Sequence, residues 1–134
     1  MNPAPLLTAT QPVPLHAFAA MAAMTLGAVQ LALPKGTPLH RSTGYIWVAL
    51  MALVAISSFA IYELQIIGPF SPIHALSVLV LGTLWIAVRS ARRDDIARHK
   101  RVMILLYGLA LMLTGAFTLM PGRIMHAVLF GGTP

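Results

Sequence analysis

The sequence has no cysteine and very little charge, and each absence removes a class of protein. Without cysteine there are no disulfides, no zinc–thiolate or iron–sulfur sites and no covalently attached c-type haem. Only 9% of the 134 residues are charged, whereas a typical soluble domain has about 25%. The chain therefore lacks the polar groups that would cover a water-facing globule of this size.

Apolar residues, by contrast, are abundant: they make up 58% of the chain and raise its mean hydropathy to +0.83. They gather in four long stretches that contain almost no charge: residues 13–33, 44–67, 72–88 and 102–120. Crossing the hydrocarbon of a bilayer takes about 20 residues, with about 17 as the minimum, and a helix satisfies its own backbone amides in lipid. We therefore predict a single all-α domain over residues 1–134, an integral membrane four-helix bundle.

The formal net charge of +6 is distributed unevenly along the chain. The links at residues 34–43 and 89–101 hold every lysine and arginine except Arg123. Because this charge lies at span boundaries, it leaves no basic face for a duplex, and we expect no nucleic acid partner. The positive-inside bias places both links in the cytoplasm and both termini outside. We therefore expect a multi-pass protein of a bacterial inner membrane with periplasmic termini.

Small residues recur in two of the apolar stretches at spacings that place them on one helix face: Ala19, Ala23 and Gly27 in the first stretch, Gly108 and Gly115 in the fourth. In lipid, helices associate through close contacts at such residues, so these faces predict bundle packing. Trp85, near the cytoplasmic end of the third stretch, is typical of an anchor at the membrane interface.

The five histidines lie near the ends of the predicted spans. With the orientation above, His40 and His99 lie at the cytoplasmic ends of the second and fourth spans. The remaining three, His16, His74 and His126, lie on the periplasmic side. Each side of the membrane thus has at least two imidazoles that come from different helices.

One interpretation of these two layers is the binding of haem b, which is held between imidazoles from facing helices. The predicted ligand pairs are His40 with His99 in the inner layer and His74 with His126, or with His16, in the outer layer. Basic groups that could meet the haem propionates follow at the same ends: Arg41, Arg101 and Arg123. Two stacked haems would carry electrons across the membrane.

A second interpretation is a metal, proton or quinol site on the outer side. Imidazole together with carboxylate suits zinc, iron or copper, and the outer group offers His74, His126, His16 and the carboxylate of Glu63. An ionisable residue inside a span is a functional candidate by default. A carboxylate beside a histidine can also accept protons from a quinol, so a quinone is a predicted partner.

A third interpretation gives the histidines no cofactor. Histidines at membrane boundaries are tolerated and cap helices, and His99 follows Asp95 at the spacing of an ordinary helical pair. The hydroxyls of residues 57, 58, 114 and 118 are expected to bond to the backbone or between helices. The sequence has no phosphate-binding loop and no nucleophile elbow, so it offers no catalytic residues for hydrolysis or nucleotide chemistry.

Three motifs resemble a known family: residues 40–48 with the pattern His-Arg-x-x-Gly-aromatic, residues 72–77 around His74, and residues 92–103 around His99. Tyr107 and Gly115 also fit. Over residues 39–130 the chain is similar to the small bacterial predicted membrane proteins grouped as domain of unknown function 2306. This resemblance implies a helical protein with several membrane spans and implies no established activity. It supports His40, His74 and His99 and gives no support to the other two histidines.

We conclude from the sequence that the chain is a small inner-membrane protein, either a b-type haem-binding subunit or another redox-associated subunit. Its short links and lack of a catalytic domain indicate that it works within a larger membrane complex and has no independent catalytic activity. Two alternatives stay open. One is a cofactor-free accessory or assembly subunit of a respiratory or photosynthetic complex, and the other is a small metal- or quinol-binding membrane protein.

Overall fold

The computed structural model describes residues 3–61 and 72–131, and all regular structure within these two ranges is helical. The long helices are α2 (Val13–Ala32), α3 (Pro38–Ser58), α4 (Pro72–Arg92) and a last one built from α5 (Ile96–Leu105), η1 (Leu106–Leu113) and α6 (Thr114–Phe117). Each of the four is long and apolar enough to cross a membrane. The predicted all-α fold with four spans is thereby confirmed. Two short helices, α1 (Ala4–Leu7) and α7 (Ile124–Phe130), flank them.

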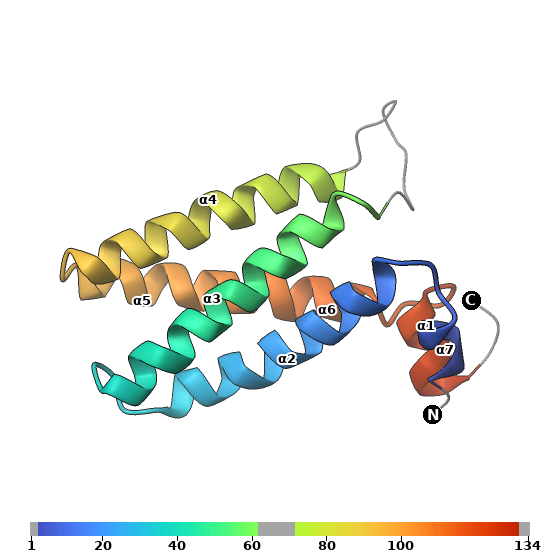
Figure 1. Ribbon diagram of the computed structural model, residues 1–134, viewed down its shortest axis with the longest axis horizontal. Helices are drawn as coiled ribbons and strands as arrows, with labels where there is room; N and C mark the ends of the chain where they lie inside the picture. The colour runs from blue at the N-terminus through green and yellow to red at the C-terminus, as the bar shows by residue number, and fades with distance from the viewer. Residues whose placement is uncertain (1–2, 62–71, 132–134) are drawn as a thin grey trace.

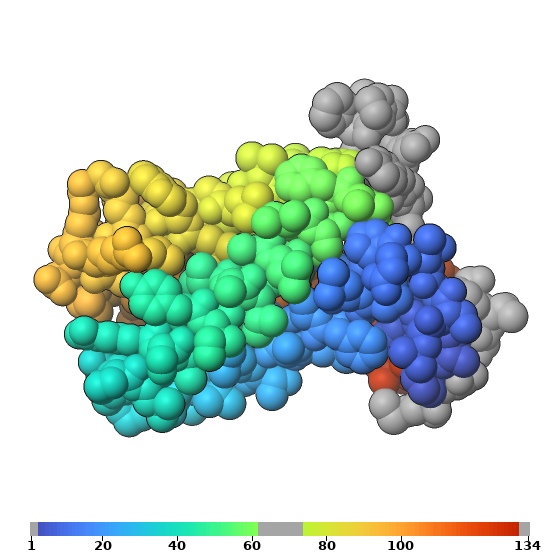
Figure 2. Space-filling model, viewed as in Figure 1, coloured from blue at the N-terminus to red at the C-terminus, as the bar shows by residue number. Residues whose placement is uncertain are grey.

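The long helices form two hairpins that pack against each other, as Figure 1 shows. Helix α2 pairs with α3, α4 pairs with α5, and α3 packs against α4 between the hairpins. The segment η1 contacts both α2 and α4, which closes the four helices into a bundle. Seen from the side drawn in Figure 2, α2, α3 and α4 lie in front of most of the last long helix.

Both basic links lie at one end of this bundle, which we call the basic end. The α2–α3 and α4–α5 connections meet there, whereas α1 and α7 pack together at the opposite end, which we call the far end (Figure 1). The basic end thus carries eight of the nine lysines and arginines: Lys35, Arg41, Arg89, Arg92, Arg93, Arg98, Lys100 and Arg101. Both links lie at the same end of the bundle, as the expectation requires, and the side of the membrane that this end faces stays a prediction.

Two helices begin before the apolar stretches that predicted them, because polar residues cap their first turns. The Thr37 hydroxyl accepts a hydrogen bond from the His40 backbone N–H over 3.1 Å at the start of α3. The Asp95 carboxylate accepts from the Arg98 N–H, also over 3.1 Å, at the start of α5. Such caps replace the missing helical partners of the first N–H groups. His40 and His99 therefore lie inside the first turns of their helices.

The end of α3 also differs from the sequence prediction. The helix stops at Ser58, and the chain turns at Phe59 and Ala60, whereas the apolar stretch continues to residue 67. Residues 62–71, which include Glu63, lie outside the part of the chain that the structure describes. The predicted role of Glu63 in an outer site therefore stays a prediction.

The centre of the bundle is small and tightly filled. Trp47 and Met51 are each 1% exposed and Ala23 is fully buried, with Val80, Leu84, Leu106 and Leu111 completing the cluster. The predicted packing face of α2 is confirmed, since Ala19, Ala23 and Gly27 are all buried. Many large apolar side chains are instead exposed, as expected for helices that have lipid as their solvent.

The middle of the last long helix is wound as a π-helix over η1, which the sequence did not indicate. Wider turns rotate successive residues less than α-helical turns do, so residues seven apart no longer share a face. The prediction that Gly108 and Gly115 form one packing face is therefore wrong. A Cβ at Gly115 would lie 3.0 Å from Met24 Cε, whereas a Cβ at Gly108 would meet nothing within 4 Å.

Candidate functional site

Two aromatic side chains meet over a glycine in the half of the bundle nearer the basic end. A Cβ on Gly27 would lie 2.6 Å from two ring carbons of Tyr107 and 2.7 Å from Nε1 of Trp47. The Trp47 indole N–H donates to the Ala23 carbonyl over 2.9 Å, and the Tyr107 hydroxyl donates to the Met24 carbonyl over 3.2 Å. These contacts fasten α3 and η1 to the same turn of α2.

Gln30 lies about one turn further toward the basic end and is 6% exposed. Its side-chain Nε2 donates to the His40 carbonyl over 2.8 Å, across the interface of α2 and α3. A Cβ on Gly44 would lie only 2.9 Å from that nitrogen. The amide reaches His40 because residue 44 has no side chain. This contact explains why Gly44 lies four residues, or one helical turn, after His40.

Two polar side-chain atoms of Gln30 and His40 have no hydrogen-bond partner. Among the residues that the structure describes, the buried side-chain nitrogens and oxygens without a hydrogen bond are Oε1 of Gln30 and Nδ1 of His40. Leaving a buried polar atom unpaired costs about 1–3 kcal/mol. The two atoms are chemically complementary, because the amide oxygen accepts and an imidazole Nδ1–H donates. The cluster is thus ready to bind a polar group or to pair internally.

His99 lies at the same end on α5, across the bundle from α3. Its Nδ1 is 2.9 Å from the Ala87 carbonyl of α4. A carbonyl only accepts, so Nδ1 carries the proton and, in the neutral ring, Nε2 carries the lone pair. The sequence had offered Asp95 as a helical partner. The structure instead uses the Asp95 carboxylate as the helix cap and directs the His99 ring to α4.

The other histidines lie toward the far end and make separate contacts. His16 Nδ1 is 3.1 Å from the Val54 carbonyl and 3.0 Å from the Ser57 hydroxyl, which joins α2 to α3. His74 Nε2 is 3.2 Å from the Phe59 carbonyl, and the two rings lie 5.6 Å apart. The ring of His126, in α7, contacts the ring of Phe130 at an angle of 41°, with 5.1 Å between the ring centroids.

The predicted basic residues also fall at both ends. Arg41 and Arg101 are exposed in the first two turns of α3 and α5, and the Arg123 guanidinium lies 5.4 Å from the ring of Phe117. Within residues 3–61 and 72–131, no three histidine or acidic side chains gather closely enough to hold a metal ion. The outer metal site and the pairing of His74 with His126 stay predictions.

The structure adds Gln30 to the residues that sequence reasoning had singled out. The sequence does single out Gln30, because it is the only residue with a side-chain amide in the first apolar stretch. Hydroxyl and amide side chains within spans commonly bond across helices. Trp47 lies within the family-like motif of residues 40–48, and its close approach to Gly27 follows from the packing of α2 on α3.

Comparison with known proteins identifies a family for this chain. The family described as predicted membrane protein, DUF2306, matches residues 13–133. This match includes α2 with Gly27 and Gln30, whereas the motifs noticed in the sequence began at residue 39. No curated protein and no solved structure matches the chain. With nearly the whole chain matched, the protein belongs to the DUF2306 family of predicted membrane proteins.

Proposed function

We propose that this protein is a redox-associated membrane subunit, in which His40 and His99 would hold a b-type haem at the basic end. The observation that carries the proposal is how the Nδ1 atoms of the two histidines are hydrogen-bonded. The His99 Nδ1 is hydrogen-bonded to a backbone carbonyl, and the His40 Nδ1 and the Gln30 Oε1 are both buried without a partner. Both rings can therefore offer Nε2 to a ligand.

The contact of His99 is typical of a metal-ligating histidine. An imidazole that ligates through Nε2 is oriented by the hydrogen bond that its Nδ1–H donates to a carbonyl or carboxylate. Ala87 supplies the carbonyl for His99. Gln30 supports the same role for His40, because its Nε2 is already fixed on the His40 backbone and its Oε1 is free to accept.

The surroundings limit where the haem would lie. Trp47 is 1% exposed and contacts the Gly27 position together with Tyr107, so the two rings fill the bundle axis. The haem would therefore lie between this aromatic layer and the basic links. Arg41 and Arg101 are exposed beside the two histidines and would bind the propionates. When bound, the haem supplies one-electron chemistry, and the chain supplies ligation, orientation and positive charge.

The location that we propose follows from the charge. The basic end faces the cytoplasm of a bacterial inner membrane, because the positive-inside bias favours the side with eight of the nine basic residues. At the basic end the connections between helices are short, at residues 33–37 and 93–95, and leave little room for a catalytic surface there. The protein thus works beside other membrane subunits, and electrons reach or leave it through a neighbouring protein or a quinone.

A reduced-minus-oxidised absorption spectrum tests this function. The protein is purified in mild detergent from cells with ample haem, and we expect the bands of a low-spin b-type haem with two imidazole ligands. His40→Ala and His99→Ala should each remove that signature without lowering the amount of protein in the membrane. Ser42→Ala is the matched control, since this exposed residue lies in the same motif and only bonds back to Leu39.

The same preparation gives the outcomes that contradict the proposal. A flat difference spectrum from fully expressed wild-type protein removes the haem. Haem that persists in both histidine variants removes these ligands. Co-purification with an oxidoreductase in the absence of any chromophore would instead favour the cofactor-free accessory subunit.

A further inference from the structure

Trp85 and Arg89 form an exposed pair on α4 near the basic end. Trp85 is 62% exposed, and the Arg89 guanidinium carbon lies 5.0 Å from the centroid of the indole ring. A cation over an indole face is attracted by the ring electrons and keeps its charge available to other partners. The pair lies where an aromatic anchor and a snorkelling arginine are expected, at the boundary between lipid tails and headgroups.

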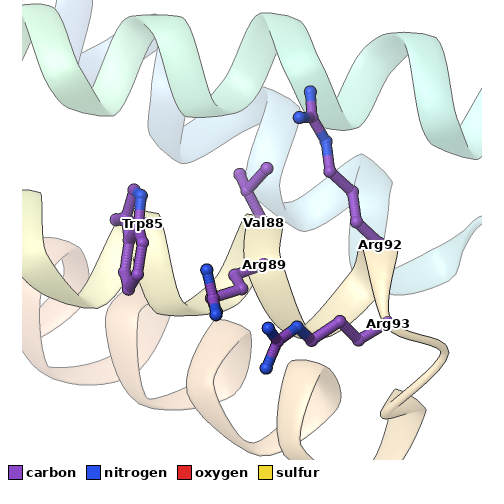
Figure 3. A pocket seen from close by; sticks show the side chains of 5 residues that line it. All are labelled: Trp85, Val88, Arg89, Arg92 and Arg93. Atoms are coloured by element: carbon purple, nitrogen blue, oxygen red, sulfur yellow. The ribbon is translucent and has the colours of Figure 1, made fainter.

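Two neighbouring hollows open around this pair. The larger, of about 320 Å³, is lined by Trp85, Val88, Arg89, Arg92 and Arg93. The smaller, of about 180 Å³, lies toward α5 and shares Trp85, Arg89 and Arg93 with the first. Figure 3 shows Arg89 and Arg93 extending along the same side of α4 toward Trp85, whereas Arg92 points away toward α3. Two guanidinium groups thus converge on the space beside one indole.

Little negative charge opposes these arginines. Asp95 is the one carboxylate that lines the smaller hollow, together with Arg98. That carboxylate already accepts the Arg98 backbone N–H as the cap of α5. Arg89, Arg92 and Arg93 are all exposed, and within residues 3–61 and 72–131 the structure gives none of them a carboxylate partner. The linings of the two hollows therefore have more arginine than aspartate, and an anion would balance this net positive charge.

The apolar side of the site indicates what kind of anion fits. Above Trp85, toward the middle of the bundle, α4 presents Val78 and Leu79 outward with 62% and 64% exposure. A ligand on this face meets guanidinium groups at one end and an apolar helix surface along the rest. Arginine binds phosphate oxygens in a planar, forked geometry. The ligand that matches both parts is a phospholipid with an anionic headgroup.

We propose that the hollows around Trp85, Arg89 and Arg93 bind the phosphate of an anionic phospholipid from the leaflet at the basic end. The acyl chains lie along the outward face of α4 beside Val78 and Leu79. This site is separate from the His40–His99 cluster and does not depend on the proposed haem. Basic pockets on membrane helices near the cytoplasmic side commonly hold such headgroups.

Tryptophan quenching by brominated lipids tests the proposal directly. The purified protein is reconstituted into mixed bilayers in which only one lipid is brominated: dibromo-phosphatidylglycerol in phosphatidylcholine in one series, and dibromo-phosphatidylcholine in phosphatidylglycerol of the same chain length in the other. Trp85 reports on lipid at this site, because the only other tryptophan, Trp47, is 1% exposed. We expect a preference for phosphatidylglycerol at Trp85 that falls about fivefold for each arginine removed in Arg89→Ala and Arg93→Ala.

Two further variants separate a formed site from diffuse attraction. The double replacement Arg89→Lys with Arg93→Lys keeps the charge and the topology but removes the forked geometry, and it should lose part of the preference. Lys100→Ala removes an equal charge from the exposed surface of α5, outside both hollows, and should leave the preference unchanged. Free glycerol phosphate, which has no acyl chains, should not compete at millimolar concentration.

Three results would overturn the proposal. The first is equal quenching by the two lipids in the wild-type protein. The second is a Lys100→Ala variant that loses as much preference as Arg93→Ala, which would mean that only the overall charge matters. The third is full competition by glycerol phosphate, which would assign the hollows to a soluble anion. Circular dichroism of each variant in the same bilayers confirms that the helices are intact.

Discussion

The side-chain amide of Gln30 donates to the backbone carbonyl of His40 over 2.8 Å and thereby joins two helices at the basic end. The contact passes over Gly44, where a Cβ would lie 2.9 Å from the amide nitrogen. A residue in α2 thus explains a spacing in α3. His40 and Gly44 are one turn apart because the His40 carbonyl accepts the hydrogen bond and Gly44 leaves space for the Gln30 amide.

This relationship predicts energetic coupling between Gln30 and Gly44. Gly44→Ala should displace the amide from the His40 carbonyl and lower the free energy of unfolding by about 1 kcal/mol. In a Gln30→Ala background the same change should cost nothing, because the new methyl group then meets no amide. Unfolding in mixed detergent micelles measures the four proteins of this double-mutant cycle. Strictly additive effects would contradict the contact.

Gly27 should tolerate no larger residue. In Gly27→Ala the new Cβ would overlap the rings of Trp47 and Tyr107, and neither ring can move without disturbing the core. We expect a loss of about 1–3 kcal/mol in the free energy of unfolding, typical of overpacking. Gly82→Ala is the control, since its Cβ would meet nothing within 4 Å. A Gly27→Ala protein as stable as the control would refute the packing described here.

The hydrogen bonds of the two aromatic residues should each contribute a modest stability. Trp47→Phe removes the donor to the Ala23 carbonyl, and Tyr107→Phe removes the donor to the Met24 carbonyl. We expect each change to lower the free energy of unfolding by about 0.5–1.5 kcal/mol, with the larger loss for Trp47 because volume is lost as well. Tyr45→Phe, at a ring that is 53% exposed, should change nothing measurable.

The proposed orientation has a simple test in living cells. A reporter fused after Pro134 should be active in the periplasm, and the same reporter inserted in the α4–α5 link should be active in the cytoplasm. The physical reason is the concentration of eight basic residues at the basic end. The reverse pattern of activity would mean that the charge does not set the topology and would move the His40–His99 cluster to the outer side.

The length and charge of the segments predicted the parts of the fold that depend on transfer from water to lipid. The number of long helices and the placement of both basic links at one end follow from the free energy of transferring apolar and charged residues from water to lipid. The same reasoning brought His40 and His99 to one end of the bundle. Helix beginnings were predicted less well, because Thr37 and Asp95 extend two helices into polar sequence.

What could not be predicted depends on the rotation of a helix about its axis. The first apolar stretch is apolar on nearly all sides, so its sequence does not show that Gln30 points inward. The π-helical turns of η1 change the faces on which Tyr107, Gly108 and Gly115 lie, and a regular helical period assigns them wrongly. These orientations are decided by packing between helices, which no single stretch of sequence contains.

The pairing of α1 with α7 has a consequence for rearranged chains. Helices from the two extremes of the polypeptide lie side by side at the far end, as Figure 1 shows, although they are more than a hundred positions apart in the sequence. A short linker could join them and turn the chain into a closed ring. A circular permutant opened between α4 and α5 should then assemble the same bundle from the opposite starting point.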